Sequence, residues 1–234
     1  ADAVTGQARY QAQVTQTAET IPGYTRVSAE NQAINIAIED PANVASKNVR
    51  TFYYTEQTVD ITYEVVGPDG CGTVDPTSET VKVITGTVKG STPAAEDGFQ
   101  FVGWYKDEAC TQLVDEGWVN ADNKLTPGKT ANLGKDKDGN DIMGYAAATY
   151  YAKFEYDITD LTITKTYADG ALLDENQSAV FTVSDGKDFS IDVVIHGNDR
   201  VVIKGLKVGT TYTVTEKTGW TWRYTTAQTS QTSP

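Results

Sequence analysis

Polar and apolar residues alternate along many short stretches of this chain, the pattern of strands with one buried face. The clearest stretch is "TYTVTE" at residues 211–216, where Tyr212 and Val214 share one face and threonines occupy the other. The same alternation places Glu216 on the apolar face. A carboxylate there needs an explanation, because burying an unpaired charge is costly.

A second stretch, "LTITK" at residues 161–165, carries the opposite charge at an equivalent position. Leu161 and Ile163 share a face with Lys165, and the intervening threonines form the other face. Together the two stretches predict a buried amine and a buried acid at strand ends. Such groups must pair with each other or become neutral.

Strand-like stretches follow one another through three segments, residues 1–56, 57–156 and 157–234, with no flexible linker between them. No long amphipathic helix is present, and Thr, Val, Tyr and Gly are abundant, so we expect a mainly β protein. The expected architecture is a series of small β-grasp-like or α+β modules followed by an immunoglobulin-like β-sandwich. We expect the polar tail, "AQTSQTSP", to be frayed.

Charge and composition exclude several classes of function. The chain has 32 acidic and 19 basic residues, a formal net charge of −13, whereas nucleic-acid binding needs a basic surface. The same charge disfavours docking on anionic lipid, and no apolar run is long enough for membrane insertion. One His and one Met leave little for metal chemistry, so we expect no metal site and no cofactor.

Three resemblances to known families rest on specific stretches. Residues 157–234 resemble the Cna B-type domain of Gram-positive surface proteins and pilins, through "LTITKTYADG", "VVIKGLKVGTTYTVTE" and "WTWRY". Residues 57–156 resemble a Listeria–Bacteroides-type surface repeat, through "FVGWYKDEACTQLV" and "TYYAKFE". Residues 1–56 look like the later part of a MucBP module, through "TIPGYTRVSAENQAINI", so we expect this module to be truncated at its N-terminus.

The Cna B-type resemblance implies a chemical role for the buried pair. Lys165 matches the family's nucleophile and Glu216 matches its catalytic acid, which together form a lysine–asparagine isopeptide bond in a single turnover. A neutral amine is a nucleophile and a protonated acid is a proton donor, so the residue types suit the reaction. The alternative is an ordinary buried ion pair.

The sequence departs from the family pattern at the acceptor. The family carries its acceptor Asn or Asp on a final strand after the position of "WTWRY". Here only "TTAQTSQTSP" follows, with neither residue, so we expect the domain to lack its last strand. The acceptor would then come from beyond residue 234, from another chain that supplies a strand, or from an in-chain residue not identified.

Other candidate sites lie in the middle segment. Cys71 and Cys110 are expected to form a disulfide in an oxidising environment. Trp104, Tyr105 and Trp118 are candidates for a sugar-stacking surface, although aromatic strands more often build a core. The stretch "DKDGND" at residues 136–141 concentrates acidic oxygens as calcium loops do, but the turn interpretation is favoured.

These observations favour a non-enzymatic structural and adhesive segment of a Gram-positive cell-surface protein. It would be extracellular and attached to the cell wall through an anchor outside this chain, and its ligand would be a host or mucus glycoprotein or glycan. One alternative is an accessory carbohydrate-binding or spacer region of a secreted carbohydrate-active enzyme. Another is a pilin shaft subunit.

Overall fold

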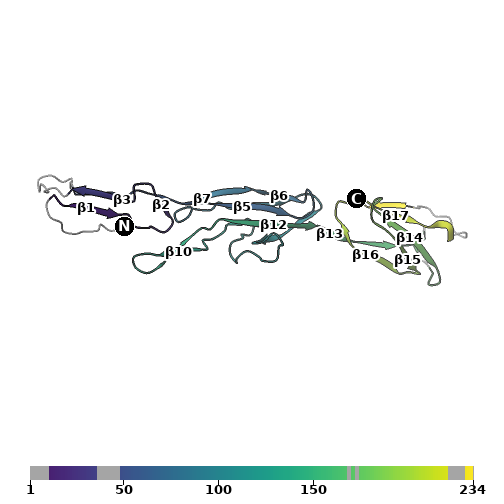
Figure 1. Cartoon of the computed structure of the whole chain (residues 1–234). Helices are drawn as coiled ribbons and strands as arrows, with labels where there is room; N and C mark the ends of the chain where they lie inside the picture. Colours follow the sequence, from purple (N-terminus) through teal and green to yellow (C-terminus); the bar gives the residue numbers. More distant parts are fainter. Residues whose placement is uncertain (1–10, 36–47, 168–169, 172–173, 221–229, 234) are drawn as a thin grey trace. The chain divides into compact units, whose positions relative to one another are not determined.

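The computed structural model describes residues 11–35, 48–167, 170–171, 174–220 and 230–233. Within these ranges the protein is mainly β, as the alternation predicts, with eighteen strands and one short 3-10 helix (Figure 1). The strands β1 to β9 are Gln13–Thr17, Tyr24–Arg26, Asn31–Asn35, Tyr54–Glu56, Thr58–Val66, Gly72–Asp75, Ser78–Lys82, Thr92–Ala95 and Phe99–Tyr105. The strands β10 to β18 are Ala131–Lys135, Asp141–Gly144, Ala148–Tyr156, Ile158–Thr164, Ser178–Ser184, Ser190–His196, Arg200–Lys207, Tyr212–Glu216 and Ser230–Ser233, and the 3-10 helix η1 is Thr218–Trp220.

The strands form several small antiparallel sheets rather than one large sheet. Two sheets have four strands, in the orders β7-β5-β12-β9 and β15-β14-β17-β18. The others are the pairs β1-β3, β2-β4, β6-β8, β10-β11 and β13-β16. Such small sheets cannot bury a face alone, so each depends on packing against a neighbour.

Backbone contacts group the chain into two compact units, and the middle segment contributes to both. One unit comprises Ala1–Tyr63, Pro76–Ser91 and Asp115–Tyr150, and the other comprises Glu64–Asp75, Thr92–Val114 and Tyr151–Pro234. The division into modules at residues 56 and 156 remains a prediction from the sequence.

The C-terminal strands form two sheets around one hydrophobic core. The pair β13-β16 contributes Ile163, Ile203 and Leu206, and the four-stranded sheet contributes side chains such as Phe181 and Val183. The partly buried Leu161 and Val214 pack against this core. The alternation in "LTITK" and "TYTVTE" therefore predicts the buried faces correctly.

The described part of the polar tail, Ser230–Ser233, is a strand rather than the frayed segment that we predicted. Ser230–Ser233 form β18, which pairs antiparallel with β17 so that Gln231 lies opposite Val214 and Ser230 lies opposite Thr215. The free edge of β17 supplies backbone donors and acceptors, and these pair even with a segment that has no apolar residues. The predicted strand "WTWRYTT" lies outside the described residues, except for Trp220 in η1.

Candidate functional site

Lys165 and Glu216 lie next to each other, as their strand positions predict. Lys165 follows the last residue of β13, and Glu216 is the last residue of β17 in the other sheet. The Lys165 Nζ atom lies 2.6 Å from Glu216 Oε2. The Lys165 side chain is 26% exposed and the Glu216 side chain is 3% exposed, so the acid is buried and the amine retains access to solvent.

The register of β17 fixes the direction of the Glu216 side chain. Glu216 lies opposite Phe181 of β14, and the next residue, Lys217, donates its backbone N–H to Val180 O at 2.8 Å. The Lys217 ammonium pairs with Asp192, and the Asp192 carboxylate also accepts a hydrogen bond from Thr182 Oγ1. Both the backbone and the side chain of Lys217 are therefore bonded, which holds the end of β17 next to Glu216. Lys217 and Asp192 are more exposed than Glu216.

The pair has the groups needed for amide formation, but among the described residues no Asn or Asp is hydrogen bonded to it. A hydrogen bond of 2.6 Å between an amine and a buried carboxylate is a path for moving a proton from Lys165 to Glu216. That transfer leaves a neutral nucleophile beside a neutral acid. In the described part of the chain, neither group is hydrogen bonded to Asn or Asp, and the sequence of β18 contains neither residue.

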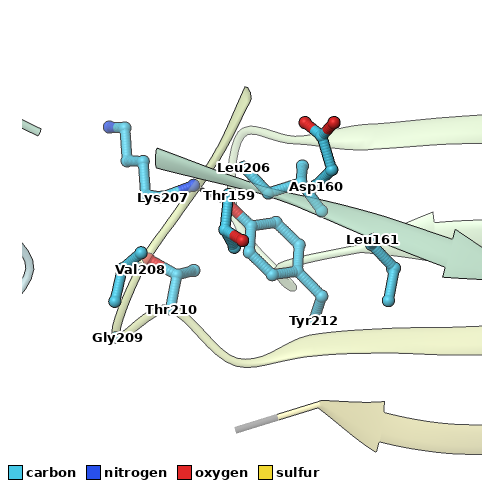
Figure 2. Close-up of a pocket in the computed structure, with 9 residues that line it drawn as sticks. All are labelled: Thr159, Asp160, Leu161, Leu206, Lys207, Val208, Gly209, Thr210 and Tyr212. Carbon is cyan, nitrogen blue, oxygen red and sulfur yellow. Dashed lines mark hydrogen bonds between the residues drawn. The ribbon is translucent and has the colours of Figure 1, made fainter. Parts of the chain in front are cut away.

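A small pocket lies near the other end of β17 and does not include the pair. Figure 2 shows the Tyr212 ring extending toward Thr159 and Leu206. The Tyr212 hydroxyl accepts a hydrogen bond from the Lys207 backbone N–H at 3.1 Å. Tyr212 is buried, so its ring closes this end of the sandwich.

The predicted disulfide is absent, and both cysteines are free thiols. Cys71 is only 1% exposed and lies against Gly67, where an added Cβ would meet its sulfur at 2.9 Å. Cys110 occupies a tight turn at a φ of 53°, and its thiol is directed to Glu108 O at 3.6 Å. The first thiol lies in a core and the second in a local turn, and a disulfide between them under oxidising conditions stays a prediction. Burial raises the pKa of both thiols.

The three aromatic candidates for sugar stacking differ in burial. Trp104 is 1% exposed and packs edge-to-face with Phe101 at a centroid distance of 6.0 Å. Tyr105 is half-buried and pairs with Tyr151 of β12. Trp118 is half-buried, and its ring lies edge-to-face with Tyr150 at 6.0 Å. A buried indole cannot stack on a sugar, so the prediction for Trp104 is wrong. Tyr105 and Trp118 are partly exposed, and for them sugar stacking stays a prediction.

The acidic stretch at residues 136–141 is a hairpin turn between β10 and β11. Asp136 Oδ1 accepts the backbone N–H groups of Asp138 and Asn140 at 2.9 and 2.8 Å. The backbone bond from Asn140, then its side-chain bond, lowers the pKa of Asp136. Among the described residues, no group of three or more His, Cys, Asp or Glu side chains could hold a metal ion. Nor does any described helix have the length and apolar character to cross a membrane.

Sequence reasoning missed two carboxylates that bind backbone amides. Glu79 accepts hydrogen bonds from the Tyr63 hydroxyl and from the backbone N–H groups of Lys89 and Gly90. Glu56 accepts those of Ile84 and Thr85, both at 2.7 Å. Both glutamates lie on the more buried face of their strands, since Glu79 shares a face with Val81 and Glu56 shares a face with Tyr54. The alternation that singles out Glu216 therefore also marks these two residues.

Comparisons with protein-family models, with curated proteins and with solved structures found no match to this chain. The candidate site therefore rests on its own geometry and on the stretches that resemble Cna B-type domains.

Proposed function

We propose that this chain is a non-enzymatic structural and adhesive segment of a bacterial cell-surface protein, with an amide-forming site at Lys165 and Glu216. The observation that supports this most is the 2.6 Å contact between the amine and a buried carboxylate that joins two sheets of a β-sandwich. Burying the Glu216 carboxylate is costly, so a pair at this position is expected either to have very good geometry or to serve a further role. A covalent crosslink between strands is such a role in a protein that bears tension.

The reaction would proceed in steps that the two side chains can carry out. A proton moves from the Lys165 ammonium to the Glu216 carboxylate, and the neutral amine attacks the carboxamide carbon of an asparagine. A new carbon–nitrogen amide bond forms, and the bond from that carbon to the original amide nitrogen breaks. Glu216 gives its proton to the departing nitrogen, which leaves as ammonia, and then takes the second proton of the attacking Lys165 nitrogen, so that Glu216 ends protonated beside the new amide.

The asparagine would come from beyond residue 234, or from another chain that supplies a strand in place of β18. The chain's own β18 has neither Asn nor Asp, so an exchanged strand that bears Asn would complete the site. We propose that the segment lies outside the cell, attached to the wall through an anchor elsewhere in the parent protein. Its ligand would be a host or mucus glycoprotein or glycan.

An asparagine scan of β18 tests the chemistry. Four variants each carry one substitution, Ser230→Asn, Gln231→Asn, Thr232→Asn or Ser233→Asn. At least one should lose about 17 Da, the mass of ammonia, in intact-mass measurements on denatured protein. Adding Lys165→Arg should abolish the loss, because a guanidinium keeps the charge but is not a nucleophile. Adding Lys204→Arg, at an exposed lysine of β16, should not. Full mass in all four variants would contradict the proposal.

A further inference from the structure

At two places in the chain, only one residue separates the end of one strand from the start of the next. Gln57 is the one residue between β4 and β5, and Asp157 is the one residue between β12 and β13. Both positions fall where the families that the sequence resembles change. A single residue in an extended chain can act as a hinge unless its backbone groups are bonded.

At the first position, both backbone groups of Gln57 are bonded. Its N–H donates to Gly23 O at 2.9 Å, and its carbonyl accepts the N–H of Val83 at 2.9 Å. Gln57 is therefore held between the turn before β2 and the residue that follows β7.

At the second position, Asp157 makes the same two bonds with a different set of residues. Its N–H donates to Gly98 O at 2.9 Å, and its carbonyl accepts the N–H of Val208 at 2.8 Å. Asp157 is therefore held between the turn before β9 and the turn from Lys207 to Thr210, which Figure 2 shows beside Tyr212.

The two glycines occupy equivalent turns. In residues 21–24 the N–H of Tyr24 donates to Ile21 O at 3.1 Å, and in residues 96–99 the equivalent bond is 3.0 Å long. The third residue of each turn is glycine, with a φ of 77° at Gly23 and 82° at Gly98. This conformation favours glycine strongly. The strand after the first turn, β2, pairs with β4, which precedes Gln57. The strand after the second turn, β9, pairs with β12, which precedes Asp157.

Gly23 and Gly98 also lie close to the loops whose backbone N–H groups bond to Gln57 and Asp157. A Cβ at Gly98 would lie 2.8 Å from the backbone oxygen of Val208. A Cβ at Gly23 would lie 2.6 Å from the Ile84 Cδ1 atom. Both contacts leave no room for a side chain, although the first is with rigid backbone and the second is with a flexible side chain.

Glu56, the residue before Gln57, and Tyr156, the residue before Asp157, each add a side-chain contact. Glu56 contacts the residues that follow Val83, and Tyr156 contacts the residue that precedes Val208. The Glu56 carboxylate accepts hydrogen bonds from Ile84 N and Thr85 N. The Lys207 Nζ atom lies over the Tyr156 ring, 3.7 Å from the ring centroid, which is a cation–π distance. One contact is a set of hydrogen bonds and the other is a cation–π contact, but both are made by the residue that precedes the linking residue.

We propose that Gly23–Gln57 and Gly98–Asp157 are two copies of one docking device, in which a glycine turn and a single linking residue receive a loop of the following module. The partner of this surface is the next module of the chain. The device prevents bending at the linking residue, so adjacent strands transmit force without a flexible joint. It does not depend on the chemistry proposed for Lys165.

Amide hydrogen exchange followed by NMR tests the proposal. The amides of Gln57 and Asp157 should exchange about a hundredfold more slowly than unstructured amides, as strand amides do. Gly98→Ala should speed exchange at Asp157 and Val208 by about tenfold or more, because the added methyl group cannot fit beside the Val208 oxygen. The matched control is Gly139→Ala, which has a φ of 84° but no atom within 4 Å of the added group.

The control should leave exchange at Asp157 and Val208 unchanged. If Gly98→Ala does not fold, Gly23→Ala gives the equivalent test at Gln57 and Val83, because its clash is only with a movable side chain. Exchange of the wild-type Gln57 and Asp157 amides at the rate of exposed loops would overturn the proposal. So would equal effects of Gly98→Ala and Gly139→Ala.

Discussion

The Lys165 ammonium lies 2.6 Å from a Glu216 carboxylate that is 3% exposed, and the two residues come from different sheets. The contact joins the end of β13 to the end of β17, 51 residues apart along the chain. The pair is most sensitive to the loss of Lys165, because the Glu216 carboxylate would stay buried without its partner, whereas the Lys165 amine keeps access to solvent.

Removing Lys165 alone should destabilise the C-terminal sandwich more than removing both charges. We expect Lys165→Ala to cost roughly 2–4 kcal/mol, because the Glu216 carboxylate is left without its partner. The double variant Lys165→Met, Glu216→Leu should cost less, since no buried charge remains. Exchange of the core amide of Val183 measures the difference. A double variant less stable than Lys165→Ala would contradict the account.

Acid should weaken the contacts of Glu79. Burial raises its pKa, but the hydrogen bonds from Lys89 N, the Tyr63 hydroxyl and Gly90 N together hold it below the ordinary value. A carboxyl whose pKa is lowered by folding stabilises the fold above the unfolded pKa of about 4.3, and this contribution is lost as pH falls below that value.

Unfolding measured between pH 7 and pH 3 tests this expectation. Glu79→Gln should be less stable than the wild type at pH 7, and its stability should fall less on acidification. The matched control is Glu64→Gln, at an exposed glutamate of β5. Equal pH dependence in Glu79→Gln and the wild type would refute the role of Glu79.

The two thiols should react at different rates. Cys71 is 1% exposed and Cys110 is half-buried, so a maleimide should label Cys110 in the folded protein and Cys71 only after denaturation. Mass spectrometry of unreduced, denatured protein should show two labels per chain. No label under those conditions would mean that a disulfide forms after all.

Trp104 should be needed for stability rather than for binding. Trp104→Ala removes a ring that is 1% exposed, and we expect a loss of about 3–5 kcal/mol. Leu113→Ala, at a side chain that is 65% exposed, is the control and should have little effect. Thermal melting of the variants gives the comparison. A folded Trp104→Ala protein with unchanged melting would contradict the core assignment.

Alternation along single strands predicted much of the fold and part of the site. The faces of "TYTVTE" and "LTITK" are buried as expected, and Lys165 and Glu216 meet because the end of each strand carries a charge on its buried face. Local pattern is sufficient here, because side-chain direction in a strand has a period of two residues.

Contacts that depend on pairing between distant strands could not be predicted. The segment "SQTS" forms β18 through backbone bonds to β17, which no side-chain pattern reveals. Cys71 and Cys110 share a segment, yet separate local environments determine their state. The bonds of Gln57 and Asp157 are made by backbone groups, which every residue type carries.

The most direct measurement of the central claim is a tryptic peptide map of the β18 variant that loses mass. The account predicts a branched peptide in which the Lys165 side chain is joined to the introduced asparagine, with no cleavage after Lys165, because trypsin requires a free amine. Replacing Glu216 by Ala in that variant should restore most of the linear peptides, since the proton relay is gone. Linear peptides alone, with normal cleavage after Lys165 in every asparagine variant, would contradict it.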